Sequence, residues 1–171
     1  MNLKPSIYLS GAIERSLDYI SWRTEFKEKL SYKYNVIIPY AKSTKLTKDN
    51  PKYKKFVFDN YIVPDINDVI SSKYFFVKID KAVLRGAGTG SEICFARWNF
   101  KHMVYILEDG LTELDIPGWI LGCLFQAKKV KMLDEAIDFY RNLKLLPDKN
   151  KLFNKIVSLS NKIYDYEHGV E

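Results

Sequence analysis

The sequence predicts an α/β fold in which a five-stranded parallel sheet is covered by helices on both faces. Short apolar runs with strand character alternate along the chain with longer segments whose apolar residues recur at helical spacing, and this alternation is typical of parallel sheets. A length of 171 residues fits one domain with a sizeable core. The chain contains no internal repeat and no low-complexity tract.

The first predicted strand is Ser6–Ser10, an apolar segment that stops at Gly11. A helix is predicted over residues 17–30, because apolar residues recur there near helical spacing, at Ile20, Trp22, Phe26 and Leu30. The second strand, Asn35–Ile38, ends at Pro39. The order of strand, helix and strand is that of a parallel unit.

A second helix is predicted from about Tyr53 to Ile70, with a kink or restart at Pro64 because proline has no backbone N–H. The third strand is the apolar run Tyr74–Ile79. A glycine-rich turn over residues 85–91 then leads into a third helix, Glu92–Trp98.

The fourth strand is predicted over His102–Leu107 and the fifth over Trp119–Phe125. A helix follows over residues 132–143, with Leu133, Ala136, Ile137 and Tyr140 on one face. Pro147-Asp148 marks a break before a last amphipathic helix, Lys151–Tyr166. We therefore expect an α/β domain over residues 1–145 and a C-terminal helical extension over residues 146–171 that packs on it.

The net charge of +6 is concentrated in a lysine-rich connector, residues 42–55. A solvated loop and an anion-binding lid both explain it. The chain lacks paired zinc ligands and an arginine-rich reading helix, so a nucleic-acid partner is not favoured. His102 and His168 are isolated, which disfavours a metal site, and no Ser-His-Asp or Cys-His arrangement is indicated.

The sequence favours a cytoplasmic protein without a membrane span. Met1 to Pro5 run straight into a strand with no signal peptide, and no apolar stretch approaches the length of a membrane helix. Cys94 and Cys123 lie among apolar residues in separate elements, so we expect both to be buried and reduced.

Arg85–Glu92 is the most informative segment, because it joins a glycine turn to one carboxylate. Gly86, Gly88 and Gly90 would let the backbone approach a ligand, and the helix start would hold Glu92 ionised at its positive end. A fixed, ionised carboxylate is what attack on a glycosidic carbon requires. The alternative is a capping box, in which Thr89 and Glu92 only close the helix start. A carboxylate has enough lone pairs for both roles.

Parallel sheets of this kind bind ligands beyond the carboxyl ends of their strands. Residues 10–12, 38–40 and 86–92 all lie at such ends, so they are expected to converge on one crevice. Asp65 is either a helix cap or a proton donor that pairs with Glu92. Tyr8 is either a core side chain or a hydroxyl that faces the ligand. The aromatic residues Trp22, Phe56, Phe58 and Tyr61 fit the core, with base stacking as the alternative.

Four segments in this order resemble the nucleoside 2-deoxyribosyltransferase family, whose superfamily also contains deoxynucleoside-monophosphate and cytidine-monophosphate N-glycosidases. They are Ile7–Gly11, Trp22-Arg23, Asp65 ahead of the strand Tyr74–Asp80, and Gly88–Ala96. The resemblance covers roughly residues 5–140 and leaves out the last helix. It implies a flavodoxin-like fold, a homodimer or higher homo-oligomer, and no cofactor.

The same resemblance implies that Glu92 attacks C1′ of a (deoxy)ribosyl unit to form a covalent glycosyl-enzyme. Asp65 would help to protonate the leaving base, and Tyr8 matches the tyrosine of the family's first strand. A second base would then accept the sugar in a transferase, and water in a hydrolase. The other residues predicted to contact a nucleoside or its 5′-monophosphate are Ser10, Gly11, Ala12, Trp22, Arg85, Gly86, Gly88, Thr89, Gly90 and Ser91.

The chain departs from the family pattern at Gly86 and Ala87, where the transferases commonly carry acidic residues, and at Lys73, where an aspartate often stands. Gly86-x-Gly88-Thr89-x-x-Glu92 also resembles the signature of cytokinin-activating nucleotide phosphoribohydrolases, which implies cleavage of the same kind of bond. These departures leave open an alternative function, a non-catalytic nucleotide sensor that keeps the pocket.

Overall fold

The structure is a computed structural model that describes residues 4–13, 19–39, 47–99 and 101–144. The chain divides into two compact units, Met1–Arg141 and Asn142–Glu171. The predicted last helix, Lys151–Tyr166, and His168 lie outside the described residues, as do Lys42 and Lys45 of the connector. No helix in the described part of the chain is long and apolar enough to cross a membrane.

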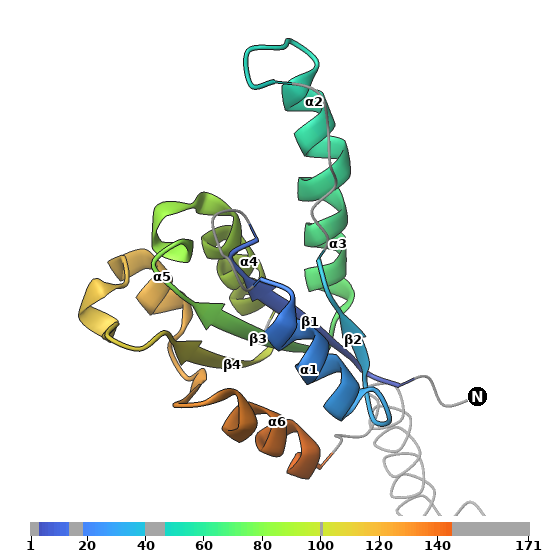
Figure 1. Ribbon diagram of the computed structural model, residues 1–171, viewed down its shortest axis with the longest axis vertical. Helices are drawn as coiled ribbons and strands as arrows, with labels where there is room; N and C mark the ends of the chain where they lie inside the picture. Colours follow the sequence, from blue (N-terminus) through green and yellow to red (C-terminus); the bar gives the residue numbers. More distant parts are fainter. Residues whose placement is uncertain (1–3, 14–18, 40–46, 100, 145–171) are drawn as a thin grey trace, which may run out of the picture. The chain divides into compact units, whose positions relative to one another are not determined.

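Five parallel strands form a single sheet in the order β2-β1-β3-β4-β5 (Figure 1). The strands are β1 (Ser6–Gly11), β2 (Asn35–Ile37), β3 (Tyr74–Ile79), β4 (His102–Leu107) and β5 (Lys128–Val130). This is the strand order of flavodoxin-like folds, so the predicted fold class is confirmed. The order reverses between β1 and β3, which pair with Tyr8 opposite Phe75 and Ser10 opposite Val77.

The helices are α1 (Ser21–Leu30), α2 (Tyr53–Val57), α3 (Val63–Ser71), α4 (Ala87–Trp98), α5 (Gly118–Cys123) and α6 (Leu133–Asn142). A π-helical turn, η1 (Phe58–Ile62), joins α2 to α3, and two short 3₁₀ turns are η2 (Val83–Arg85) and η3 (Glu113–Asp115). The helices predicted at residues 92–98 and 132–143 are present with shifted ends, and the described part of the helix predicted at residues 17–30 is helical from Ser21 to Leu30.

Helices α1 and α6 pack on one face of the sheet, where aromatic rings fill the interface. Phe26 of α1 stacks on Phe76 of β3 at 5.0 Å between ring centroids and meets Tyr140 of α6 at 5.8 Å. Tyr140 is buried, and its hydroxyl donates to the carbonyl oxygen of Phe75. Period-2 alternation along β3 sends Phe76 to this face and its neighbours to the other.

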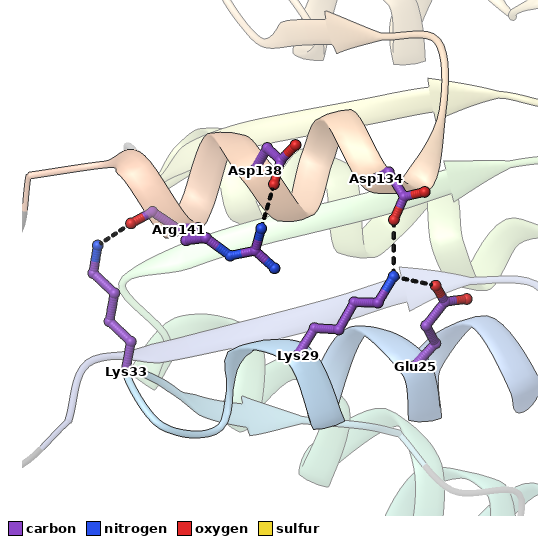
Figure 2. Close-up of polar contacts among 6 residues, drawn as sticks. All are labelled: Glu25, Lys29, Lys33, Asp134, Asp138 and Arg141. Carbon is purple, nitrogen blue, oxygen red and sulfur yellow. Dashed lines mark hydrogen bonds and ion pairs between the residues drawn. The ribbon is translucent and has the colours of Figure 1, made fainter.

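Polar contacts at the rim also join α1 to α6 (Figure 2). Lys29 of α1 forms ion pairs with Glu25 on its own helix, at 2.7 Å, and with Asp134 of α6, at 2.9 Å. Lys33 donates to the carbonyl oxygen of Arg141, near the end of α6. These ionic groups are exposed, so each pair contributes little energy.

Helices α3, α4 and α5 cover the opposite face (Figure 1). The strand residues beneath them alternate with those that face α1, and the buried cluster contains Tyr8, Val69, Phe75, Val77, Ile79, Val83, Ile93, Ala96, Met103, Tyr105, Ile116 and Leu124. Tyr8 stacks on Phe75, with 5.9 Å between ring centroids and 10° between ring planes. The side of β1 that carries Tyr8 and Ser10 therefore faces α4.

The prediction of a fifth strand over Trp119–Phe125 is wrong. That run forms the helix α5, which begins after Pro117 and sends Ile120, Leu121 and Leu124 toward the core. The edge strand is the lysine-bearing segment Lys128–Val130. A short apolar run does not by itself separate a buried strand from a short buried helix.

The predicted helix over residues 53–70 exists, and it restarts next to Pro64 as predicted, since α3 begins at Val63 after the π-helical turn. Pro64 is the second residue of α3, directly after the π-helical turn. The prediction that Phe58 lies in the core is wrong, because 54% of its surface is exposed. Phe56 and Tyr61 are half-buried and pack edge to face with each other.

Candidate active site

The carboxylate of Glu92 on α4 is held by two hydroxyl groups from β1. Tyr8 donates a 2.9 Å hydrogen bond to Oε1, and Ser10 donates one to Oε2. Ser10 is fully buried and Tyr8 is buried, whereas Glu92 keeps part of its surface exposed. The three predicted residues Tyr8, Ser10 and Glu92 are therefore brought together next to the point where strand order reverses.

Local structure explains this convergence. Residues two apart on a strand point to the same face, so Tyr8 and Ser10 both face α4. The short connection after β3, residues 80–86, starts α4 beside β1. Within that connection Asp80 accepts a hydrogen bond from the backbone N–H of Val83, which fixes the turn of η2.

The helix that carries Glu92 starts earlier than predicted. Gly86 is the N-cap and α4 begins at Ala87, so Gly88, Thr89 and Gly90 are helical and do not form a loop. The capping-box interpretation of Thr89 and Glu92 is therefore wrong. Glu92 lies in the second turn, beyond the first turn in which the helix dipole acts most strongly.

The expectation that the helix end keeps Glu92 ionised is also wrong. The pKa of Glu92 is raised to about 7, mainly by burial and to a smaller extent by the negative charge of Asp65. The hydrogen bonds from Ser10 and Tyr8 and the charge of Arg23 act in the opposite direction, since they favour the ionised form. The carboxyl group therefore holds its proton to higher pH than an ordinary glutamate does.

Asp65 lies in the first turn of α3, the helix that packs beside α4 and β1. It is partly exposed, and its charge raises the pKa of both Glu92 and Tyr8. Burial is the largest cause that lifts the pKa of Tyr8 far above its ordinary value, so the phenol stays protonated and remains a donor. Asp65 therefore belongs to the same electrostatic site as Glu92.

Arg23 is a residue of this site that the sequence analysis did not assign to it. Its guanidinium is fully buried, and it donates to the carbonyl oxygens of Gly11, at 3.0 Å, and Tyr19. Weaker contacts of 3.5 Å reach the carbonyl oxygens of Leu9 and Ala12. Burial lowers the pKa of Arg23 to about 10, so it still carries its charge at neutral pH. The planar guanidinium donates to several backbone carbonyl oxygens at once, and this fixes the chain at the end of β1.

Gly11 and Trp22 complete the support of this turn. A Cβ atom at Gly11 would lie 3.1 Å from the carbonyl oxygen of Lys78 and 3.2 Å from both Arg23 and Trp22, and φ is +154°. Only glycine fits this position without displacement. Trp22 is buried and meets Phe76 edge to face, so its ring lies in the core beneath Gly11. Ala12 is half-buried.

The remaining predicted binding residues lie at the start of α4 and in its first turns. Arg85, Gly86, Gly88 and Ser91 are exposed, and the hydroxyl of Ser91 donates to the carbonyl oxygen of Ala87, whereas Thr89 and Gly90 are buried. Gly86, Gly90 and Ser91 border an apolar groove of about 590 Å³ between α4, α5 and the end of α3. Its lining residues do not include Glu92, Tyr8 or Asp65, so the groove is separate from the Glu92 site.

Among the described residues, no three side chains of the ligand types His, Cys, Asp or Glu are grouped as a metal site would require. The arrangement instead offers a carboxylate with two hydroxyl donors, a second carboxylate and a buried cation. Such a set supports nucleophilic and acid–base chemistry.

Comparison with known proteins relates the chain to a solved structure through its fold. No family model and no curated protein matches the sequence. The fold is similar to that of a 2-deoxyribosyltransferase from the psychrotolerant bacterium Bacillus psychrosaccharolyticus, with a TM-score of 0.57. Sequence identity is 16%, and the match covers 82% of this chain and 93% of that chain. The likeness therefore extends over nearly the whole α/β unit.

Proposed function

We propose that the protein breaks the N-glycosidic bond of a (2′-deoxy)nucleoside or its 5′-monophosphate and passes the sugar to a second base or to water. Glu92 is the nucleophile in this proposal. The observation that carries it is the pairing of both Glu92 oxygens with the hydroxyls of Tyr8 and Ser10 at the strand-order reversal. The fold it shares with a 2-deoxyribosyltransferase supports the same chemistry.

The two hydroxyl donors orient the carboxylate and leave it able to react. Each oxygen of Glu92 accepts one hydrogen bond from β1 and retains a second lone pair. One oxygen attacks C1′ of the sugar, the C1′–N bond breaks, and its electron pair leaves with the base. A covalent glycosyl ester of Glu92 results.

Asp65 acts as the acid and base in this proposal. Its charge already acts on Glu92 and Tyr8, and its carboxyl group would give a proton to the departing base. In the second step, a new base or a water molecule attacks C1′, the C1′–O bond to Glu92 breaks, and the carboxylate is restored. Asp65 takes the proton of the incoming nucleophile.

The proposal is tested by trapping the covalent intermediate. A 2-fluoro-2-deoxy nucleoside slows the second step, so the intact protein should gain the mass of one fluorosugar, and peptide analysis should locate it on Glu92. Glu92→Gln, in which the amide keeps the shape of the side chain, should gain no mass. Glu28→Gln is the matched control, since Glu28 is an exposed acid on α1.

Product analysis then separates the possible activities. Free base released in water indicates hydrolysis, and a new nucleoside formed with an added base indicates transfer. If nucleosides and monophosphates bind but neither turnover nor an adduct appears with any base, the protein is a nucleotide sensor and the proposal is wrong. The homo-oligomer that the family resemblance implies remains a prediction, which sedimentation velocity would measure.

A further inference from the structure

Two cysteine thiols meet where α4 packs against α5. Sγ of Cys123, on α5, lies 3.1 Å from Sγ of Cys94, on α4, although the residues are 29 positions apart. The prediction that both thiols are buried is wrong, because each is partly exposed and free. Cys94 also lines the apolar groove on the outer side of α4, through which a small reagent reaches it.

The two sulfurs have different surroundings. The sulfur of Cys94 accepts hydrogen bonds from the indole N–H of Trp119, at 3.1 Å, and from the thiol of Cys123. Both donors point at one atom, so the Cys94 sulfur accepts two hydrogen bonds whereas the Cys123 thiol donates one. Burial, followed by the hydrogen bond to Cys94, raises the pKa of Cys123 to about 11. Cys123 therefore stays a thiol at neutral pH.

We propose that Cys94 and Cys123 form a peroxide-sensitive pair that oxidises to an intrachain disulfide, with Cys94 as the attacking thiolate and Cys123 as the resolving thiol. A disulfide bond requires the sulfurs to approach to about 2.0 Å, a movement of about 1 Å from their present separation. Reactive pairs of this kind combine an accessible sulfur with a resolving cysteine next to it.

The reaction balances with one molecule of hydrogen peroxide. The Cys94 thiolate attacks a peroxide oxygen, the O–O bond breaks, and the departing hydroxide takes up a proton as water, which leaves Cys94 as a sulfenic acid. The sulfur of Cys123 then attacks the Cys94 sulfur and the S–O bond breaks. The hydroxide leaves with the Cys123 proton as a second water. Two thiols are oxidised to one disulfide and the peroxide is reduced.

The cross-link would join α5 to the helix that carries Glu92. Cys94 lies two residues after Glu92, and Ile120 of α5 already lies 3.0 Å from where a Cβ of Gly90 would stand. The oxidised protein therefore has α4 and α5 covalently fixed beside the candidate site. This inference depends on the thiol geometry and not on the proposed glycosidic chemistry, so either can fail alone.

The test is the intact mass of the full-length protein after exposure to hydrogen peroxide and denaturation in iodoacetamide. The reduced protein should take up two alkyl groups. The oxidised protein should take up none, weigh about 2 Da less than the unmodified chain, and regain both alkylation sites after treatment with dithiothreitol. Two alkyl groups after peroxide, a disulfide-linked dimer, or sulfinic acid at Cys94 beside an alkylated Cys123 would each overturn the proposal.

Single serine variants test the order of attack. In Cys123→Ser, Cys94 should remain as a sulfenic acid that dimedone labels, because no resolving thiol is present. In Cys94→Ser, Cys123 should keep its thiol and take up iodoacetamide at the same peroxide dose. The opposite pattern of labelling would contradict the assignment of Cys94 as the attacking sulfur.

Discussion

The hydroxyl of Tyr8 lies 2.9 Å from Oε1 of Glu92 and donates to it across 84 positions of sequence. This hydrogen bond connects the middle of β1 to the second turn of α4. It links the ionisation of one carboxyl group to the packing of the central strand, and three of the predictions below follow from that link.

Tyr8→Phe should lower kcat/KM at neutral pH by about 10–100-fold, the effect of losing one hydrogen bond to a charged group. The ring would still stack on Phe75, so the fold should be unaffected. Steady-state kinetics with the best substrate of the panel measures the change. Tyr105→Phe is the matched control, because it removes a comparable 2.6 Å hydrogen bond to Glu113. Equal activities of the two variants would contradict a role for Tyr8.

The pH dependence of kcat/KM should show an ionisation with a midpoint near the pKa of Glu92, which burial raises to about 7. Activity should rise with pH through this midpoint, because only the ionised carboxylate attacks C1′. Tyr8→Phe should move the midpoint to higher pH, since the lost hydrogen bond favoured the ionised form. Asp65→Asn should move it to lower pH, since the lost charge opposed ionisation. Midpoints that move in the reverse directions would contradict this account.

Glu92 should also make stability depend on pH. Its folded-state pKa is raised above the ordinary value of 4.5, so its stabilising contribution is complete below pH 4.5 and is lost as pH rises through about 7. Glu92→Gln carries no charge at any pH. Relative to wild type, it should gain on the order of 1–3 kcal/mol of unfolding free energy between pH 5 and pH 8. Urea denaturation at both pH values measures the difference, and a pH-independent difference would contradict the raised pKa.

Arg23→Lys should destabilise the protein by about 2–4 kcal/mol, even though the charge is kept. Lysine cannot reach the carbonyl oxygens of Gly11 and Tyr19 with one planar group, so buried acceptors lose their donors. Urea denaturation measures the loss, and Arg141→Lys, at an exposed ion pair, should leave stability nearly unchanged. Similar stabilities of the two variants would show that the hydrogen bonds of the buried Arg23 guanidinium are dispensable.

Two glycines of α4 offer a matched pair of substitutions. Gly88→Ala should stabilise the protein by about 0.5–1 kcal/mol, because the helical position is open and alanine has the higher helix propensity. Gly90→Ala should be less stable than Gly88→Ala by about 1–2 kcal/mol, because its Cβ would lie 3.0 Å from Cδ1 of Ile120. Thermal melts measure both. Adding Ile120→Val to Gly90→Ala removes Cδ1 and should recover part of the lost stability. If no stability is recovered, contact with Cδ1 is not the cause of the loss.

Much of the fold could be predicted from the sequence, because most strands are buried on both faces and are separated from the helices by glycine, proline or polar residues. The place of Ser10 at the carboxyl end of β1 and the family resemblance at Tyr8 made both residues candidates for a site with Glu92, and the structure brings the three together. The short edge strand Lys128–Val130 was missed, since it carries two lysines and little apolar signal. The run Trp119–Phe125 was misassigned because six or seven apolar residues fit either a strand or a short helix.

The electrostatics of the site could not be predicted from sequence. The ionisation of Glu92 depends on where α4 begins, and glycine spacing suggested a loop where the chain is already helical. The role of Arg23 depends on tertiary packing that buries a guanidinium against carbonyls 11 to 14 residues earlier and 4 residues earlier in the chain. The sequence gives a partial indication that Arg23 is buried, because Arg23 follows Trp22 on the apolar face of the helix.

The π-helical turn between α2 and α3 explains an aromatic contact in this helical segment. In the wide turn, the N–H of Val63 bonds to the carbonyl oxygen of Phe58, five residues back. Phe56 and Tyr61 are also five residues apart, and their ring centroids lie 5.8 Å from each other. In an ordinary α-helix, residues at this spacing point about 140° away from each other. Wide turns of this kind hold one residue more than an α-helical turn. Deleting a single codon here would convert the segment to regular helix, rotate α2 and its lysines about the helix axis, and leave Asp65 in place. A one-residue deletion at this point would thus change the outer surface of the molecule without moving Asp65 of the candidate site.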